Sequence, residues 1–240
     1  MLEIYALNQN EILDDRQFNA LLSYVSSEKK TRIHKYLRRA PAQQALLSDL
    51  LARSIIHDKL SMKNTDIHFG TNDYGKPFLL GKNDFHFNLS HSGDWVVCAI
   101  SDSVVGIDVE KIKPTDFNIS KRFFSKDEHE FIVCQKEKQK LEAFYDLWTL
   151  KESYIKAVGK GLHMSLSEFS IVIYNGLIFL KHQIENQLFN FKQFSIDIRY
   201  KLSVCLENEI KDERISVISL TEFLQSIEDR RHTGFTPVYT

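Results

Sequence analysis

The sequence contains few of the residues that mark secreted, membrane-spanning or nucleic-acid-binding proteins. Among its 240 residues are three cysteines, at positions 98, 134 and 205, which fit neither a disulfide framework nor a zinc spacing. No apolar run approaches the ~18 residues of a membrane span, and the acidic first stretch has no hydrophobic segment typical of a signal peptide. The formal net charge is −1, so no global field attracts nucleic acid. We therefore expect a cytoplasmic protein with neither membrane nor nucleic-acid partners.

What is present is enough apolar sequence for a proper core, arranged in both helical and strand periods. Of the residues, 43% are hydrophobic. Apolar alternation predicts strands over residues 1–7, 67–69, 85–89, 95–101, 104–110, 169–174, 177–180 and 200–206. Spacing of 3.6 residues and capping signals predict helices over residues 14–24, 26–39 and 41–60, from Ser125, and over 142–158, with a charged break at 137–140. The mixture predicts an α+β fold.

Short similar stretches recur in the same order about a hundred residues apart. Arg53-Ser54-Ile55-Ile56 is followed at this distance by Glu152-Ser153-Tyr154-Ile155, and the strand at 95–101 by the strand at 200–206. Shared order indicates a duplicated unit. We expect two similar α+β halves, residues 1–103 and 104–208, related by pseudo-two-fold symmetry with a ligand cleft between them. Residues 209–240 form a charged extension that we expect to be partly disordered.

Two carboxylates stand two residues apart in the strand that opens the second half. In Gly106-Ile107-Asp108-Val109-Glu110, the strand period of two turns Asp108 and Glu110 to one side and Ile107 and Val109 to the other. Neighbouring carboxylates repel and raise each other's pKa, which a divalent cation relieves. Oxygen ligands suit Mg²⁺ or Mn²⁺. The alternative is a strand end with both acids hydrated.

A third carboxylate lies on the long helix of the second half. Glu152 and Lys156 are four residues apart and share a helix face with Trp148, while Lys151 is a second cation beside the acid. An acid completing a Mg²⁺ shell beside lysines that neutralise phosphate would suit a metal-bound phosphate. The alternative is a surface ion pair between Glu152 and Lys156.

Further cations and polar turns could complete an anion site. Lys29 and Arg32 share a helix face, Lys76 lies in a rigid turn, and the stretch around Ser90 and His91 offers hydroxyls and an imidazole. The alternatives are a solvated helix face and ordinary turns. A Ser-His catalytic dyad is disfavoured because the sequence has no Gly-x-Ser-x-Gly elbow.

Taken together and in order, these motifs resemble those of the 4′-phosphopantetheinyl transferases of the surfactin-synthetase-activating (Sfp) type. The resemblance runs from about Ile4 to Leu206 and rests on four stretches: Phe87-Asn88-Leu89-Ser90-His91-Ser92-Gly93, Gly106-Ile107-Asp108-Val109-Glu110, Lys121-Arg122-Phe123-Phe124-Ser125, and residues 148–162 beginning Trp148-Thr149-Leu150-Lys151-Glu152. It implies a monomeric enzyme that moves phosphopantetheine from coenzyme A to a serine of an acyl or peptidyl carrier protein of fatty-acid, polyketide or nonribosomal-peptide synthesis, releasing 3′,5′-ADP.

The resemblance also implies roles for individual residues. Mg²⁺, with Mn²⁺ as an alternative, would be held by Asp108, Glu110 and Glu152. Glu152 would also take the serine proton, and Asp108 and Lys156 would complete the catalytic set. The predicted coenzyme A contacts are Lys29, Arg32, Lys76, Ser90, His91, Lys151 and Lys156. Glu128 is a candidate for a water-mediated contact with the metal.

Two features qualify the resemblance. Gln43-Gln44 stands where the family usually has a basic residue near the 3′-phosphate, which predicts weaker discrimination between coenzyme A and its dephospho form. Residues 111–124 carry basic and apolar side chains, which would complement an acidic carrier protein. The three carboxylates of Asp108, Glu110 and Glu152, with the nearby lysines, would also suit a metal-dependent pyrophosphate hydrolase. A non-catalytic carrier-binding module is a third hypothesis.

Overall fold

The computed structural model describes residues 1–181 and 188–238 and has the mixed composition that the sequence indicates. Its strands are β1 Leu2–Asn8, β2 Phe69–Thr71, β3 Pro77–Leu79, β4 His86–Ser92, β5 Trp95–Ser101, β6 Val105–Lys111, β7 Ser170–Tyr174, β8 Leu177–Lys181, β9 Phe189–Phe194, β10 Tyr200–Glu207 and β11 Glu213–Ser219. Its α-helices are α1 Asp15–Leu22, α2 Ser27–Ile33, α3 Arg39–Leu60, α4 Asn118–Phe123, α5 Lys126–Val133, α6 Glu137–Val158 and α7 Leu220–Asp229. The prediction of an α+β fold is confirmed.

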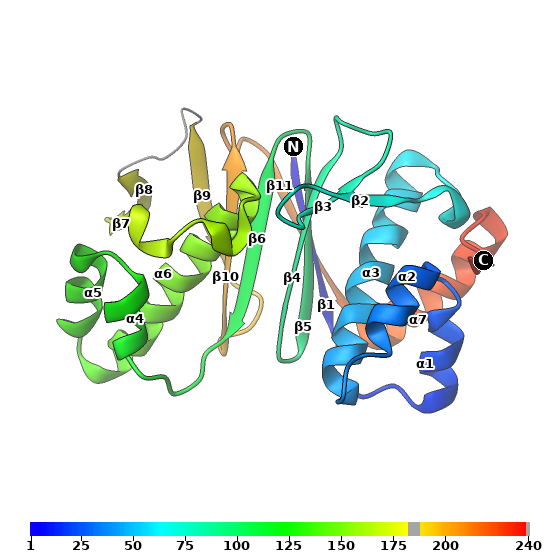
Figure 1. The fold of residues 1–240 in the computed structure, drawn as a ribbon, viewed down its shortest axis with the longest axis horizontal. Helices are drawn as coiled ribbons and strands as arrows, with labels where there is room; N and C mark the ends of the chain where they lie inside the picture. Colours follow the sequence, from blue (N-terminus) through cyan, green and yellow to red (C-terminus); the bar gives the residue numbers. More distant parts are fainter. Residues whose placement is uncertain (182–187, 239–240) are drawn as a thin grey trace.

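The strands of the described residues form two main sheets that meet in the middle of the molecule (Figure 1). One sheet has the order β11-β1-β5-β4, and the other has the order β6-β10-β9. Helices α1, α2, α3 and α7 flank the first sheet, and α4, α5 and α6 flank the second (Figure 1). Pairs β2-β3 and β7-β8 are separate hairpins. The architecture therefore places helices outside and sheets inside.

Period-two alternation in the central strands explains these layers. In β5, Val97 and Ala99 pack between the sheets against β6 and β10, while Val96 and Cys98 face the helices of the first half. Both faces of this strand are buried, which explains why its sequence is an almost continuous run of apolar residues. The strand register is fixed because a slip of one residue would exchange the two faces.

The C-terminal extension is folded over residues 213–233, so the expectation of partial disorder is wrong for this segment. Strand β11 pairs in parallel with β1, and α7 begins with a capping box at Ser219. Phe223 and Ile227 of α7 and Phe235 beyond it join the core of the first half. Charged residues of the stretch, such as Glu213 and Arg214, lie on its exposed face. Residues 239 and 240 lie outside the described part of the chain.

Two boundaries differ from those that the sequence predicts. Helix α6 begins at Glu137, so the charged break at 137–140 is wrong: the Lys140 ammonium pairs with the Glu137 carboxylate at 2.8 Å within the first turn. Strand β4 continues through Ser92 rather than ending at Leu89. Its polar residues continue the backbone pairing with β5, while the side chains of Asn88, Ser90 and Ser92 contact β6 of the second sheet.

Within the described residues, no helix combines the length and the apolarity needed to cross a membrane.

Candidate active site at the junction of the two sheets

Strand β6 presents its two carboxylates as the period of two predicts. Ile107 and Val109 are fully buried between the sheets, and Asp108 and Glu110 turn away from them to line a cavity of about 320 Å³. Asp108 is 4% exposed. The strand thus carries an acid pair into a site that its own apolar side chains hold in place.

The Asp108 carboxylate is bonded through only one of its oxygens. Oδ1 accepts from the Ser90 hydroxyl at 2.9 Å and from the Lys156 ammonium at 2.6 Å. Oδ2 is buried and has no hydrogen-bond partner. Burying a carboxylate oxygen without a partner costs folding free energy. Asp108 Oδ2 is therefore a position where a cation or a hydrogen-bond donor could bind.

Helix α6 contributes the opposite wall of the same cavity. Trp148, Glu152 and Lys156 recur every four residues and line it together, as the helical period predicts. The Lys156 ammonium also donates to the Ile107 carbonyl at 3.1 Å. The alternative of a solvated surface pair is therefore wrong for Lys156, because its bonds run to β4 and β6 rather than into solvent.

Burial and crowding of negative charge raise the pKa values of Glu152 and Glu110. Burial, together with the charge of Asp108, raises the pKa of Glu152 from its ordinary 4.5 to about 7. Burial and Asp108 also raise the pKa of Glu110. Lys156 opposes both shifts without cancelling them. Near neutral pH, partial protonation of Glu152 therefore relieves some of the repulsion between these acids.

The raised pKa of Glu152 predicts how stability depends on pH. The folded state retains a proton that the unfolded state loses above pH 4.5, so stability falls as the pH rises from about 4.5 to about 7. Glu152→Gln removes this linkage. Urea unfolding in metal-free buffer at pH 5 and pH 7.5 should show wild type losing about 2 kcal/mol more than the variant.

The control is Glu142→Gln, an exposed acid on the same helix, which should keep the wild-type dependence on pH. Equal losses for wild type and Glu152→Gln would contradict the raised pKa.

Lys151 does not face the cavity, so its predicted phosphate contact is wrong. It is fully buried and donates to both oxygens of Glu128, at 2.7 and 2.8 Å, and to the Phe169 carbonyl at 2.7 Å. One residue along a helix turns the side chain by about 100°, which carries Lys151 away from Glu152. Burial lowers the pKa of Lys151 to about 8.

Glu128 is likewise structural, so the water-mediated metal contact is wrong. It closes the capping box with Ser125 and accepts from the backbone N–H of Ile171 at 2.8 Å. The Glu128 side chain is only 3% exposed, and both of its oxygens accept hydrogen bonds from other residues.

Residues of the first half supply the third wall of the cavity. Leu89, Ser90 and His91 of β4 line it. Desolvation and the nearby Lys156 ammonium lower the pKa of His91, which favours its neutral ring. The Ser90 hydroxyl donates to Asp108 and accepts from Lys156 and from the Val109 N–H. Its one donor and two acceptor positions are all used in these bonds, and its contact with coenzyme A stays a prediction.

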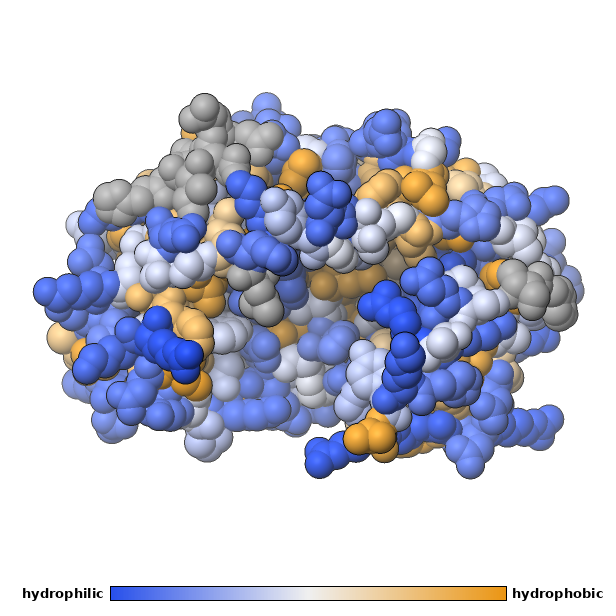
Figure 2. Space-filling model, in the orientation of Figure 1, coloured by the Kyte–Doolittle hydropathy of each residue, from blue (hydrophilic) through white to orange (hydrophobic). Residues whose placement is uncertain are grey.

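A second cavity of about 430 Å³ adjoins the first through Leu89, which lines both. Lys29 and Arg32 of α2 line it, as do Gly75 and Pro77 of the predicted turn. Figure 2 shows that this face of the molecule is hollowed near its middle, with hydrophobic residues at the bottom of the hollow. The prediction that Lys29 and Arg32 share one site is consistent with this geometry.

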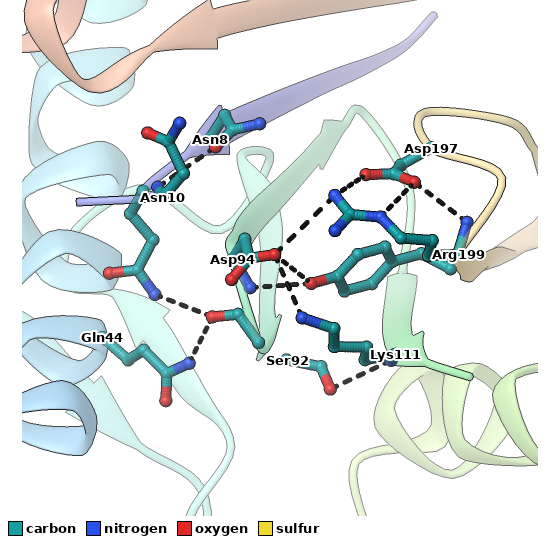
Figure 3. A network of polar contacts seen from close by, with 11 residues as sticks. Asn8, Asn10, Gln44, Ser92, Asp94, Lys111, Asp197 and Arg199 are labelled. Carbon is teal, nitrogen blue, oxygen red and sulfur yellow. Dashed lines mark hydrogen bonds and ion pairs between the residues drawn. The ribbon is translucent and has the colours of Figure 1, made fainter. Parts of the chain in front are cut away.

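Lys76 and Gln44 bond to backbone groups. Lys76 donates to the carbonyls of Val105 and Ala157, and burial lowers its pKa to about 8. Gln44 donates to the Gly93 carbonyl at 2.9 Å (Figure 3). The coenzyme A contact of Lys76 and the effect of Gln44 on selectivity stay predictions.

The residues present fit a divalent cation coordinated partly by a ligand. The orphaned Asp108 Oδ2 and the raised pKa values of Glu110 and Glu152 are what an acid cluster short of positive charge shows. Within residues 1–181 and 188–238, no three acid, His or Cys side chains converge into a ready-made metal site. Mg²⁺ commonly uses one or two carboxylates with substrate phosphates and water, so an incomplete protein shell suits it.

Two polar residues of this site escaped the sequence analysis. The Ser92 hydroxyl donates to Glu110 Oε2 at 2.7 Å, and Asn88 Oδ1 accepts from the Ile107 N–H at 2.9 Å. The available signal was that residues 88, 90 and 92 are all small and polar in a strand, where alternation puts them on one side.

Fold and cavity together define an α+β enzyme with an acid–lysine site between two sheets. A family model described as "4'-phosphopantetheinyl transferase superfamily" matches residues 104–218, and one described as "4'-phosphopantetheinyl transferase, N-terminal" matches residues 14–103. The chain belongs to the 4′-phosphopantetheinyl transferase superfamily.

Curated relatives of this family match most of the chain. The 4′-phosphopantetheinyl transferase Sfp of Bacillus subtilis is 35% identical over 93% of this chain and 100% of its own length. The transferase psf-1 of Bacillus pumilus is 34% identical over 95% and 100%. The transferase gsp of Aneurinibacillus migulanus is 40% identical over 71% of each.

Proposed function

We propose that this enzyme transfers the 4′-phosphopantetheine group of coenzyme A to a serine hydroxyl of an acyl or peptidyl carrier protein, with Mg²⁺ or Mn²⁺ as cofactor. The observation that carries the proposal is the cluster of Asp108, Glu110 and Glu152 with Lys156 in one cavity. We further propose that it is cytoplasmic. We also propose that it acts as a monomer, because residues of one chain line this cavity from β4, β6 and α6.

The proposed halves are residues 1–103 and 104–208, related by pseudo-two-fold symmetry. Two features support this division. The two family matches meet between residues 103 and 104, and each half packs a 22-residue helix, α3 or α6, on its sheet. Coenzyme A would lie across the junction of the two, since residues of both halves line the smaller cavity and Leu89 joins it to the larger one.

In this placement the two cavities divide the substrate. The cationic side chains of Lys29, Arg32 and Lys76, together with the imidazole of His91, would surround the nucleotide end. The smaller cavity would take the pyrophosphate, where Lys156 neutralises an oxygen and the carboxylates of Asp108, Glu110 and Glu152 hold the cation. The bound cation would supply charge stabilisation on the pyrophosphate and on the leaving group.

Glu152 would provide the proton transfer. Its pKa of about 7 places a carboxylate near the operating pH, which is the range in which a general base is most effective. It would take the proton of the carrier serine as that oxygen bonds to the β-phosphorus. The bond from this phosphorus to the bridging oxygen then breaks, and 3′,5′-ADP leaves.

The carrier protein would dock on residues 111–124. Lys121, Arg122 and Phe123 are exposed there, and the Arg122 guanidinium stacks over the Phe123 ring at 5.0 Å. Phe117 and Ile119 pack partly against the second half and so offer less surface. A basic and apolar patch beside the cavity complements an acidic helical carrier.

Charge reversal in this patch should weaken carrier binding alone. Arg122→Glu is expected to raise KM for the carrier about tenfold while kcat changes less than about twofold, because a rim charge acts on encounter and binding. Steady-state kinetics at several salt concentrations measure both constants. Lys211→Glu, at an exposed site outside the patch, is the control. Equal KM values for the two variants would place the carrier elsewhere.

The proposal as a whole is tested by incubating the enzyme with apo carrier protein, coenzyme A and Mg²⁺ and measuring the carrier mass. A gain equal to phosphopantetheine, with release of 3′,5′-ADP, is the expected result. Cleavage of coenzyme A without a gain in carrier mass would instead indicate a pyrophosphate hydrolase. Carrier binding without chemistry would indicate a binding module.

A further inference from the structure

The two sheets are joined at the active site by side chains in place of backbone hydrogen bonds. Strands β4 and β6 belong to different sheets, yet three N–H groups of β6 donate to side-chain oxygens of β4. Ile107 N–H donates to Asn88 Oδ1 at 2.9 Å, Val109 N–H to Ser90 Oγ at 3.3 Å, and Lys111 N–H to Ser92 Oγ at 3.1 Å. We call Asn88, Ser90 and Ser92 the seam ladder.

The seam ladder is regular because both strands have a period of two. Each bond joins residues 19 apart, so the two strands run in the same direction at this seam. Without these oxygens, β6 would have an edge of buried, unsatisfied N–H groups. Beyond the seam ladder, Asp94 accepts from the Lys111 ammonium at 3.1 Å (Figure 3) and from the Tyr200 hydroxyl at 3.0 Å.

Two of the three rungs also touch the acids of the site. Ser90 donates its hydroxyl proton to Asp108 Oδ1, and Ser92 donates its proton to Glu110 Oε2 at 2.7 Å. A hydroxyl has one donor and two acceptor positions. Because each oxygen already accepts from a backbone N–H, its proton is free to point at the carboxylate. Asn88 makes the same backbone contact and has no such bond to an acid.

This arrangement selects which carboxylate oxygens remain available. Ser90 and Lys156 both bond to Oδ1 of Asp108, which leaves Oδ2 buried and without a partner. Ser92 holds Oε2 of Glu110 in the same way. A hydrogen bond to one oxygen fixes the rotation of the carboxylate, and such outer contacts tune metal affinity strongly.

We propose that Ser90 and Ser92 of the first half are positioning residues that hold Asp108 and Glu110 of the second half in the orientation that binds the divalent cation. This inference rests on the proposed function, since it assigns the cation to these acids. The seam ladder then couples the joining of the two halves to the formation of the metal site. Each half alone would lack either the acids or the hydroxyls that orient them.

The test compares two rungs of the ladder. Ser92→Ala removes a backbone contact and an acid contact, whereas Asn88→Ala removes a backbone contact only. Mn²⁺ is titrated into each full-length protein with saturating coenzyme A, and free Mn²⁺ is measured by electron paramagnetic resonance. Ser92→Ala should raise the Mn²⁺ dissociation constant about tenfold, and Asn88→Ala should change it less than about twofold. Ser92→Thr, which keeps the hydroxyl, should restore wild-type affinity.

The outcomes separate this inference from the proposed function. Equal losses of Mn²⁺ affinity in Ser92→Ala and Asn88→Ala, or wild-type affinity in Ser92→Ala, would overturn the positioning role while leaving the metal-dependent transferase standing. A wild-type protein that binds no Mn²⁺ would overturn the metal site itself, and this inference with it. Should Ser92→Ala fail to fold, Ser92→Cys provides the same comparison, because a thiol keeps the volume but donates weakly.

Discussion

Asp108→Asn is expected to lower kcat/KM for carrier modification by about a thousandfold or more. The amide keeps the shape of the side chain and can still accept from Ser90 and Lys156 through Oδ1. It removes the negative charge and places an NH₂ group where the unpartnered Oδ2 stands. Charge stabilisation in a preorganised site is worth about 3–4 kcal/mol per group, and the loss here would affect the cation as well.

The fold should survive this change. The ion pair with Lys156 is lost, but repulsion from Glu110 and Glu152 is relieved, so we expect the free energy of unfolding to change by about 1 kcal/mol or less. Activity is measured by carrier mass gain, and stability by urea unfolding. Asp102→Asn, at an exposed acid between β5 and β6, is the matched control and should stay active. An Asp108→Asn enzyme with wild-type kcat/KM would refute the role of this carboxylate.

Gly106→Ala is expected to destabilise the protein by about 3 kcal/mol or more. A Cβ atom at this position would lie 2.0 Å from the Ser153 carbonyl oxygen and 2.4 Å from the Ala157 backbone nitrogen. Both atoms belong to the backbone of α6, so the whole helix must shift away from β6. Overpacking costs typically 1–3 kcal/mol and more when backbone must move. The glycine therefore lets helix and strand approach, and it does not keep a cleft open.

The same substitution at Gly70 provides the comparison. Gly70 is also a strand glycine, but a Cβ atom there meets the ring of Phe78, an exposed side chain that can rotate away. We expect Gly70→Ala to cost less than about 1 kcal/mol. Thermal unfolding of both variants should show a drop of about 10 °C for Gly106→Ala and a much smaller one for Gly70→Ala. Similar midpoints would mean that α6 does not rest on Gly106.

Local periodicity was sufficient to find the acids of the site. Asp108 and Glu110 face one way because they are two apart in a strand, and Glu152 and Lys156 share a face because they are four apart in a helix. These relations depend only on backbone geometry. That β6 and α6 lie against each other was implied by the family resemblance rather than by the spacing.

The same reasoning failed for residues whose role depends on a partner far along the chain. Lys151 is next to Glu152 in sequence, yet its ammonium forms an ion pair with Glu128, twenty-three positions away. Ser90 belongs to a strand rather than to a turn, since β5 pairs with it and β6 donates to it. Residues 213–233 were predicted to be part of a charged, partly disordered extension. The strand partner of β11 is β1, at the other end of the chain, and no local pattern reveals such a distant partner.

The sequence by itself determined the α+β class, the facing of each acid on its own element and the identity of the motifs. These follow from side-chain periods and chemistry, which act over a few residues. Only the tertiary structure decided which polar groups meet: Ser90 with Asp108, Ser92 with Glu110, and Lys151 with Glu128. Burial makes each of these groups need a partner, and chain folding, through contacts between distant segments, selects which partner it finds.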